Sequence, residues 1–329
     1  MTSTPTLTRP RIGISACMLG QDVRFDGGHK RNPWVNDRLA QMVDFVPICP
    51  EVESGLPTPR ESMRLVRTAG VGTALIGNRT GEDYTDRLRR WSEKRVEQIA
   101  MMDLDGYLLM KNSPSCGLER VKVYQAGVNA APATNAVGVF TELLKNRLPT
   151  LPLAEGGWMC DSALRESFLE QIFVRMRMRT TLLTNPTVGK LVAFHTDHKL
   201  QILARSPKIY RKLGPVVATA STRPLEHVIA EYCKLVHQAL TERATPGKQA
   251  NVLQHAMGYF KESLSPEEKQ ELLASIDDYR QGLHGIQVPL TLIGHHIRRH
   301  RASGWLSRQH YFQPFPKGLH RTALNVARF

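Results

Sequence analysis

The stretch GYLLMKNSPSCG, residues 106–117, places one cysteine among small and turn-forming residues directly after a short apolar run. The apolar part is typical of a buried strand, and Pro114 and Gly117 indicate that the chain turns after it. A purely structural cysteine would more naturally lie inside the apolar run. The pattern therefore predicts a strand over residues 106–111 whose carboxyl end leads to a loop carrying Cys116.

Two other cysteines follow predicted strands in the same way. Residues 11–16 (RIGISA) lead into Cys17, and residues 44–48 (DFVPI) lead into Cys49. The intervening segments include further strand patterns at 72–76 and 150–153 and helical patterns at 83–102 and 134–146. Strands that alternate with helices predict an α/β domain with a largely parallel sheet.

The carboxyl ends of parallel strands meet at one edge of a sheet, where ligands usually bind. We therefore expect Cys17, Cys49 and Cys116 to converge. Five widely spaced cysteines without a CxxC pair argue against a disulfide framework and against a zinc ribbon. Inert thiols, a nucleophile and metal ligands remain open. If they are ligands, three thiolates favour an iron–sulfur cluster, because a closed zinc site needs a fourth ligand.

The second half of the chain is predicted to be helical. Amphipathic patterns, several of them starting with proline or acidic residues, cover residues 162–181, 189–206, 224–242, 248–261, 266–284 and 288–301. We expect two domains, an α/β domain over residues 1–158 and an all-α domain over residues 159–329.

The positive charge is concentrated in this second half. The whole chain has a formal net charge of +14. Residues 1–160 hold 20 Lys and Arg against 17 Asp and Glu, a net of +3, whereas residues 161–329 hold 24 against 13, a net of +11. Such a surface is either simply solvated or faces a polyanion such as nucleic acid.

The sequence does not suggest a membrane protein. No apolar run approaches the roughly 20 residues that a membrane-spanning helix requires. The first residues, MTSTPTLTRPR, lack the apolar segment of a signal peptide. We therefore expect a cytoplasmic location.

The cysteine motifs, taken together, carry a family resemblance. SACMLG with VRFDG, CPEV with SGLPTPR, and KNSPSCG occur in this order and resemble the three motifs of the thiouracil desulfidase (TudS) family over residues 10–155. LVAFHTDHKLQILARSPKIYRKLG and YFQPFPKGL resemble the helical YbgA-like domain that is found fused to it. The pairing is similar to the tRNA 4-thiouridine desulfidases of the RudS type.

This resemblance implies a desulfidase that depends on a [4Fe–4S] cluster and causes no net redox change. Cys17, Cys49 and Cys116 would hold the cluster, and its open iron would bind the sulfur of the substrate while water attacks the carbon. Glu51 is the expected proton-transfer group, and Ser113 would orient it or relay a proton. Arg24 and Asp26 are expected to shape the substrate pocket, although they could also simply pair at the surface.

One position departs from the family pattern. Ser54–Gly55 stands where the family commonly has two glycines before Leu-Pro. The change could alter the geometry of the loop, but it removes neither a ligand nor the acid.

The resemblance also implies tRNA as a partner of the basic helical domain. The expected RNA contacts are Lys199, Lys208, Tyr210, Arg211, Arg298 and Arg299, with Tyr210 able to stack on an exposed base. A solvated helix face is the alternative for Arg298 and Arg299, which lie in the run HHIRRHR.

The predicted function is conversion of 4-thiouridine in tRNA to uridine with release of hydrosulfide. One alternative is a desulfidase for free thiouracil, with the helical domain serving oligomerisation. Another is a non-catalytic iron–sulfur sensor that binds RNA. The charge of the second half favours tRNA over the free base, and Glu51 argues against a sensor, which needs no proton-transfer group.

Overall fold

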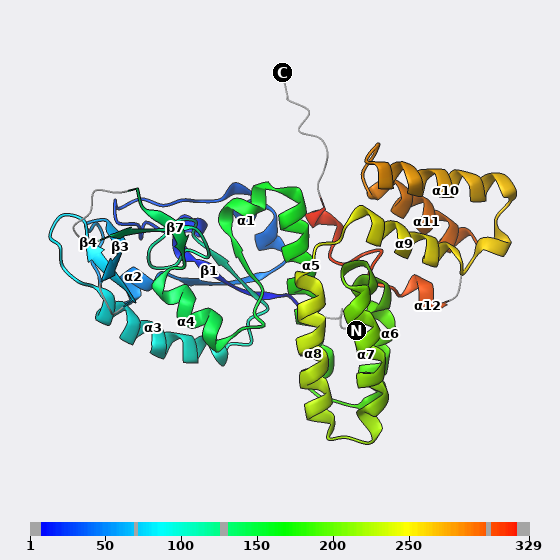
Figure 1. Cartoon of the computed structure of the whole chain (residues 1–329), viewed down its shortest axis with the longest axis horizontal. Coiled ribbons are helices and arrows are strands. Elements are labelled where there is room, and N and C mark those ends of the chain that lie inside the picture. The colour runs from blue at the N-terminus through cyan, green and yellow to red at the C-terminus, as the bar shows by residue number, and fades with distance from the viewer. Residues whose placement is uncertain (1–7, 69–71, 126–130, 301–303, 321–329) are drawn as a thin grey trace, which may run out of the picture. The chain divides into compact units, whose positions relative to one another are not determined.

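A computed structural model describes residues 8–68, 72–125, 131–300 and 304–320 (Figure 1). The chain divides into two compact units. The first contains the residues up to Met176 and a C-terminal stretch that begins at Gly318, and the second is Arg177–Lys317. The sequence placed the domain boundary after residue 158, ahead of helix α5 (Ser162–Met178). In the structure the first unit extends to Met176 and so includes most of that helix.

The first unit is an α/β domain, as predicted. Its main sheet has the strand order β2-β1-β5-β8, and every neighbouring pair is parallel. The strands are β1 (Arg11–Ser15), β2 (Asp44–Ile48), β5 (Gly106–Leu109) and β8 (Leu153–Glu155). All four residues of β5 are buried, as is typical of a parallel strand covered on both faces.

A glycine sets the close packing of the two central strands. Gly13 of β1 lies opposite Tyr107 of β5, and a Cβ atom at Gly13 would lie 2.3 Å from the ring of Tyr107. That ring is 1% exposed and packs 5.8 Å, centroid to centroid, from Phe140. The absence of a side chain at Gly13 thus makes room for the largest residue of the neighbouring strand.

A second sheet was not predicted from the sequence. It has the order β4-β3-β6-β7, with an antiparallel β3–β4 pair, a parallel β3–β6 pair and an antiparallel β6–β7 pair. Its strands are β3 (Met63–Thr68), β4 (Gly72–Gly77), β6 (Val121–Gln125) and β7 (Ala133–Ala136). Only β4 corresponds to a predicted strand.

The helix predicted over residues 134–146 is therefore wrong at its start. Ala133–Ala136 pairs with β6, and helix α4 (Val139–Arg147) begins after Gly138. The first three residues of the predicted helix, 134–136, instead belong to β7 in the second sheet.

Helices α3 and α4 lie side by side along the sheets (Figure 1). Trp91 of α3 (Thr85–Ala100) and Phe140 of α4 are in contact, with ring centroids 5.9 Å apart. The α/β unit also contains α1 (Pro33–Asp37), α2 (Pro50–Glu53) and most of α5.

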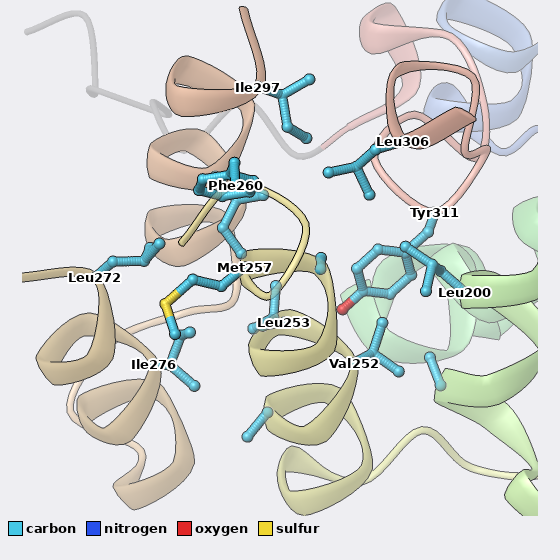
Figure 2. Close-up of a cluster of buried hydrophobic side chains, with 14 residues drawn as sticks. Leu200, Val252, Leu253, Met257, Phe260, Leu272, Ile276, Ile297, Leu306 and Tyr311 are labelled. Atoms are coloured by element: carbon cyan, nitrogen blue, oxygen red, sulfur yellow. The ribbon is translucent and has the colours of Figure 1, made fainter. Parts of the chain in front are cut away.

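The second unit is helical, as predicted. Its helices are α6 (Val188–Arg205), α7 (Pro207–Ala218), α8 (Leu225–Thr241), α9 (Pro246–Met257), α10 (Pro266–Gln281), α11 (Gln287–Arg299) and α12 (Gly304–Ser307). Figure 2 shows its hydrophobic core, where Leu272 and Ile276 of α10 face Met257 of α9. Among the described residues, no helix is both long enough and apolar enough to span a bilayer.

We predict that Gly13→Ala destabilises the α/β unit by about 1–3 kcal/mol, because the new methyl group overlaps the buried ring of Tyr107. Urea unfolding followed by tryptophan fluorescence measures this effect, since Trp34, Trp91 and Trp158 belong to this unit. Gly157→Ala is the matched control, because its Cβ would make only an ordinary contact, 3.8 Å from Lys111. An unchanged unfolding midpoint for Gly13→Ala would contradict the packing.

Candidate functional site

The three predicted cysteines line one cavity at the carboxyl edge of the main sheet. Cys17 lies in the short 3₁₀ helix η1 (Ala16–Leu19) after β1, Cys49 directly follows β2, and Cys116 lies in the loop after β5. Because β2, β1 and β5 are adjacent and parallel, their carboxyl ends meet. The cavity has a volume of about 330 Å³ and is lined by all three cysteines.

Cys116 is buried and is held by hydroxyl groups. Its sulfur lies 3.6 Å from Oγ of Ser15, and Ser15 Oγ also accepts a hydrogen bond from the backbone amide of Met110 at 3.0 Å. The amide of Cys116 donates to Oγ of Ser113 at 3.2 Å. Ser15, at the end of β1, therefore contacts both the Cys116 thiol and the backbone just after β5.

The loop that carries Cys116 rests on the first turn of α4. The amides of Gly138, Val139 and Phe140 donate to the carbonyls of Gly117, Pro114 and Ser115 at 2.9, 3.2 and 2.9 Å, respectively. A Cβ atom at Gly138 would lie 2.6 Å from the amide nitrogen of Cys116. The otherwise unpaired amides at the start of α4 thus fix the position of the loop.

Cys49 is the residue before the first turn of α2. Its amide donates to Oε1 of Glu53 at 3.1 Å, and its sulfur lies 3.8 Å from the carbonyl oxygen of Val23. Cys17 is buried, and its carbonyl accepts hydrogen bonds from the amides of Gly20 and Lys30 at 3.3 and 2.9 Å. Each cysteine is therefore held in place by the backbone of a different loop.

Burial disfavours the thiolate form of all three cysteines. It raises the pKa of Cys17 to about 12 and that of Cys49 to about 11, and it also raises the pKa of Cys116. The neighbouring cysteines add to the increase for Cys17, because each thiolate would repel the next. A bound metal centre would remove this penalty, since its positive charge stabilises the thiolates that bind it.

Glu51 lines the same cavity and is held by two side chains. Its Oε2 accepts hydrogen bonds from Nε and Nη2 of Arg60 at 2.8 and 2.5 Å. Its Oε1 accepts a hydrogen bond from the hydroxyl of Ser115 at 2.6 Å. The side chains of Arg60 and Glu51 are only 6% and 13% exposed, so this ion pair is largely withdrawn from water.

Ser113 reaches Glu51 only through a neighbour. Its hydroxyl lies 2.9 Å from that of Ser115, which in turn contacts the carboxylate. Arg24 also lines the cavity and forms an ion pair with Asp26 at 3.4 Å, whereas Asp26 is not part of the lining. The structure thus places Cys17, Cys49, Cys116, Glu51, Ser113 and Arg24 around one space, with Asp26 beside it.

Sequence reasoning missed Arg60 and Ser115. Both stand inside motifs that were recognised, at the end of SGLPTPR and within KNSPSCG. A lone basic residue after a Pro-rich turn could have been proposed as the partner of the acid. Nothing in the sequence distinguishes Ser115 from Ser113 as the direct contact of Glu51.

The departure at Ser54 fits the loop geometry. Ser54 has a φ of −77°, which any residue can adopt, and its hydroxyl donates to the carbonyl of Glu51 at 2.8 Å. The left-handed conformation falls on Gly55, with a φ of +88°. The glycine that the turn requires is therefore present.

The predicted RNA contacts of the helical unit separate into two groups. Lys199 and Tyr210 line a second cavity of about 470 Å³ together with Thr196, Leu200, His255, Tyr259 and Trp305. Lys208, Arg211, Arg298 and Arg299 are exposed, and Arg299 forms an ion pair with Glu268. The exposure of the second group is compatible with a solvated surface and with RNA contact alike, while Lys199 and Tyr210 lie at a cavity with aromatic walls.

The arrangement of the thiols fits a polynuclear centre. All three line one cavity, and each comes from a different segment of the chain. An iron–sulfur cluster instead bonds each thiolate to a different iron. Two buried thiols and one half-buried thiol, from three loops around one cavity, match this requirement.

In the metal-free protein we predict that Cys17 and Cys49 react with iodoacetamide more slowly at pH 8 than exposed Cys160. Their raised pKa values leave little thiolate, so their rates should rise about tenfold per pH unit up to pH 10. Peptide mass spectrometry at each pH measures the rates. Reaction of Cys17 and Cys49 as fast as that of Cys160 at pH 8 would contradict this view of the site.

Comparisons with known proteins follow the two units. Residues 12–156 match the family model described as 2-thiouracil desulfurase, and residues 199–316 match that described as protein of unknown function (DUF1722). The uncharacterized protein YbgA of Escherichia coli strain K12 is 35% identical over 153 residues, which are 46% of this chain and 90% of YbgA. The uncharacterized protein YbbK of Bacillus subtilis strain 168 is 31% identical over 113 residues, 32% of this chain and 72% of YbbK.

A solved structure, that of the [4Fe-4S]-dependent thiouracil desulfidase TudS, aligns at 28% sequence identity with a TM-score of 0.39. The alignment covers 48% of this chain and 99% of that one. The first of the two family matches contains all three cysteines, Glu51, Arg60 and Ser115. The chain therefore belongs to the 2-thiouracil desulfurase family in its first half and to the DUF1722, or YbgA-like, family in its second.

Proposed function

We propose that this protein removes sulfur from 4-thiouridine in tRNA, giving uridine and hydrosulfide, with a [4Fe–4S] cluster held by Cys17, Cys49 and Cys116. The observation that carries the proposal is the cavity itself, where the three thiols and the Glu51–Arg60 pair line one space. The match to the 2-thiouracil desulfurase family supports a thiolated pyrimidine as the reacting group.

A [4Fe–4S] cluster held by these thiols would supply a Lewis-acidic iron with affinity for sulfur. The reaction is a hydrolysis in which no electrons are gained or lost. The oxygen of water becomes the carbonyl oxygen of the pyrimidine, and the protons of water leave with sulfur as hydrosulfide and a released proton.

Glu51 is the group that moves the proton in this proposal. Its Oε2 accepts hydrogen bonds from Arg60, while Oε1 accepts one from the hydroxyl of Ser115. A carboxylate oxygen has a second lone pair, so Oε1 can also accept a proton from water. Arg60 and Ser115 position the carboxylate, and the hydroxyl of Ser113 lies within hydrogen-bonding distance of that of Ser115.

The helical unit supports tRNA as the substrate. Residues 161–329 carry a net charge of +11, which suits contact with phosphates. The cavity lined by Lys199, Tyr210, Tyr259 and Trp305 offers aromatic faces and a cation, the combination that holds an unstacked base. A tRNA substrate also implies a cytoplasmic location.

A free thiopyrimidine is the second candidate substrate, because the matching family model is described as 2-thiouracil desulfurase. The test uses the full chain, reconstituted anaerobically with iron and sulfide. It is incubated separately with thiolated tRNA and with free 4-thiouracil, and mass spectrometry of the products is the readout.

We predict loss of 4-thiouridine and formation of uridine in tRNA, only with the cluster present, and with a rate that falls as salt rises. Cluster-free protein is the control. Turnover of the free base alone would assign the reaction to free thiopyrimidines and leave the helical unit a structural role. No turnover of either substrate by the intact cluster would favour the sensor.

A second prediction concerns Glu51. Glu51→Gln keeps the size of the side chain but removes the proton acceptor, so turnover should fall by at least about 100-fold. The visible spectrum of the cluster should not change. Glu119→Gln, which alters an exposed carboxylate near the Cys116 loop, is the matched control and should retain activity. Loss of the cluster spectrum in Glu51→Gln would make Glu51 a structural residue instead.

A further inference from the structure

We propose that Glu268, His296 and His300 form a binding site for a zinc-type divalent metal ion in the helical unit. Glu268 lies in the first turn of α10, His296 lies in the last turn of α11, and His300 is the residue directly after that helix. One ligand atom from each of the three residues lies within 4.8 Å of the other two. The inference is independent of the desulfidase reaction, because none of these residues lines either cavity.

The two histidines are spaced to share one ion. They are four residues apart, so they project from the same face of α11 one turn apart. Their rings are nearly parallel, with an interplanar angle of 13° and centroids 5.7 Å apart. The same spacing of two histidines on a helix serves zinc binding in other proteins.

The second observation is a pair of unsatisfied nitrogens. In the described part of the chain, Nδ1 of His296 and Nε2 of His300 are buried and have no hydrogen-bond partner. His296 as a whole is only 4% exposed. A buried polar atom without a partner costs free energy, and native proteins avoid it. A metal ion bound by the lone pair of each nitrogen would remove that cost.

Glu268 has structural partners that also orient it. One oxygen, Oε2, accepts from the amide of Ser265 at 2.9 Å in the capping box of α10, and the other, Oε1, is paired with Arg299. These contacts alone would explain Glu268, but they leave the two histidine nitrogens unexplained. Each carboxylate oxygen has two lone pairs, so Oε1 can bind an ion as well. Arg299 and Ser265 then act as the outer partners that fix a metal-binding carboxylate.

The donor set selects the kind of ion. Two imidazole nitrogens and one carboxylate suit Zn²⁺ and similar transition metals. Mg²⁺ and Ca²⁺ prefer sites built from oxygen. Three protein ligands leave a position for water. Bound there, the ion would cross-link the start of α10 to the end of α11.

The test counts zinc bound by the full-length, chelator-stripped chain. Zn²⁺ is titrated in competition with a chromophoric chelator into the wild type, His300→Ala, Glu268→Gln and His295→Ala. His295 is the matched control, since it is exposed on the same helix outside the cluster. The cysteine cavity is unchanged in every variant, so its own zinc binding cancels in the comparison.

We expect His300→Ala and Glu268→Gln to bind this equivalent of Zn²⁺ at least about 100-fold more weakly, since even outer partners of a metal matter by 10–100-fold. Zn²⁺, but not Mg²⁺, should raise the melting temperature of the wild type and of His295→Ala more than that of His300→Ala. Unchanged zinc affinity in His300→Ala and Glu268→Gln would overturn the proposal. Equal loss in His295→Ala would also overturn it, because the binding would then belong to surface histidines in general.

Discussion

The parallel pairing of β1 with both β2 and β5 brings together the three thiols of the cysteine cavity. It brings the carboxyl ends of three strands together, although Cys17, Cys49 and Cys116 are far apart in sequence. The close packing of Gly13 on Tyr107 holds β1 against β5. Without this register, neither the thiols nor the Glu51–Arg60 pair would lie around the same space.

Electrostatics then decides what the cavity can hold. Buried thiols resist ionisation, and each thiolate would make the next less favourable. The same space contains a carboxylate whose charge is balanced by Arg60. A cationic metal centre bound by the thiols would stabilise their thiolate forms and offset the repulsion between them.

Much of this arrangement could be predicted from the sequence. The apolar runs before the three cysteines gave the strands β1, β2 and β5, and parallel topology gave their convergence. The second sheet could not be predicted as easily. Its strand β3 mixes charged and apolar residues. Three of the four residues of β7 are Ala or Asn, which are depleted in strands.

The sequence also did not predict which side chains contact one another. Arg60 was missed because a basic residue after a Pro-rich turn is only a candidate partner for the acid, and its contact with Glu51 depends on how that turn folds back. In the run HHIRRHR, charge alone suggested a solvated face or RNA contact. The structure instead buries His296 and pairs Arg299 with Glu268, which lies 31 residues earlier. These neighbouring residues differ in their tertiary contacts, which cannot be deduced from composition.

The support of the Cys116 loop by α4 has a thermodynamic consequence. The first amides of α4 donate hydrogen bonds to the carbonyls of that loop. Fraying at the start of α4 and displacement of Cys116 therefore break the same hydrogen bonds and occur together. Any ligand that holds Cys116 stabilises the closed state and thus slows hydrogen exchange at Val139 and Phe140. Hydrogen exchange at the start of α4, a helix that contributes no thiol, therefore shows whether a ligand occupies the cavity.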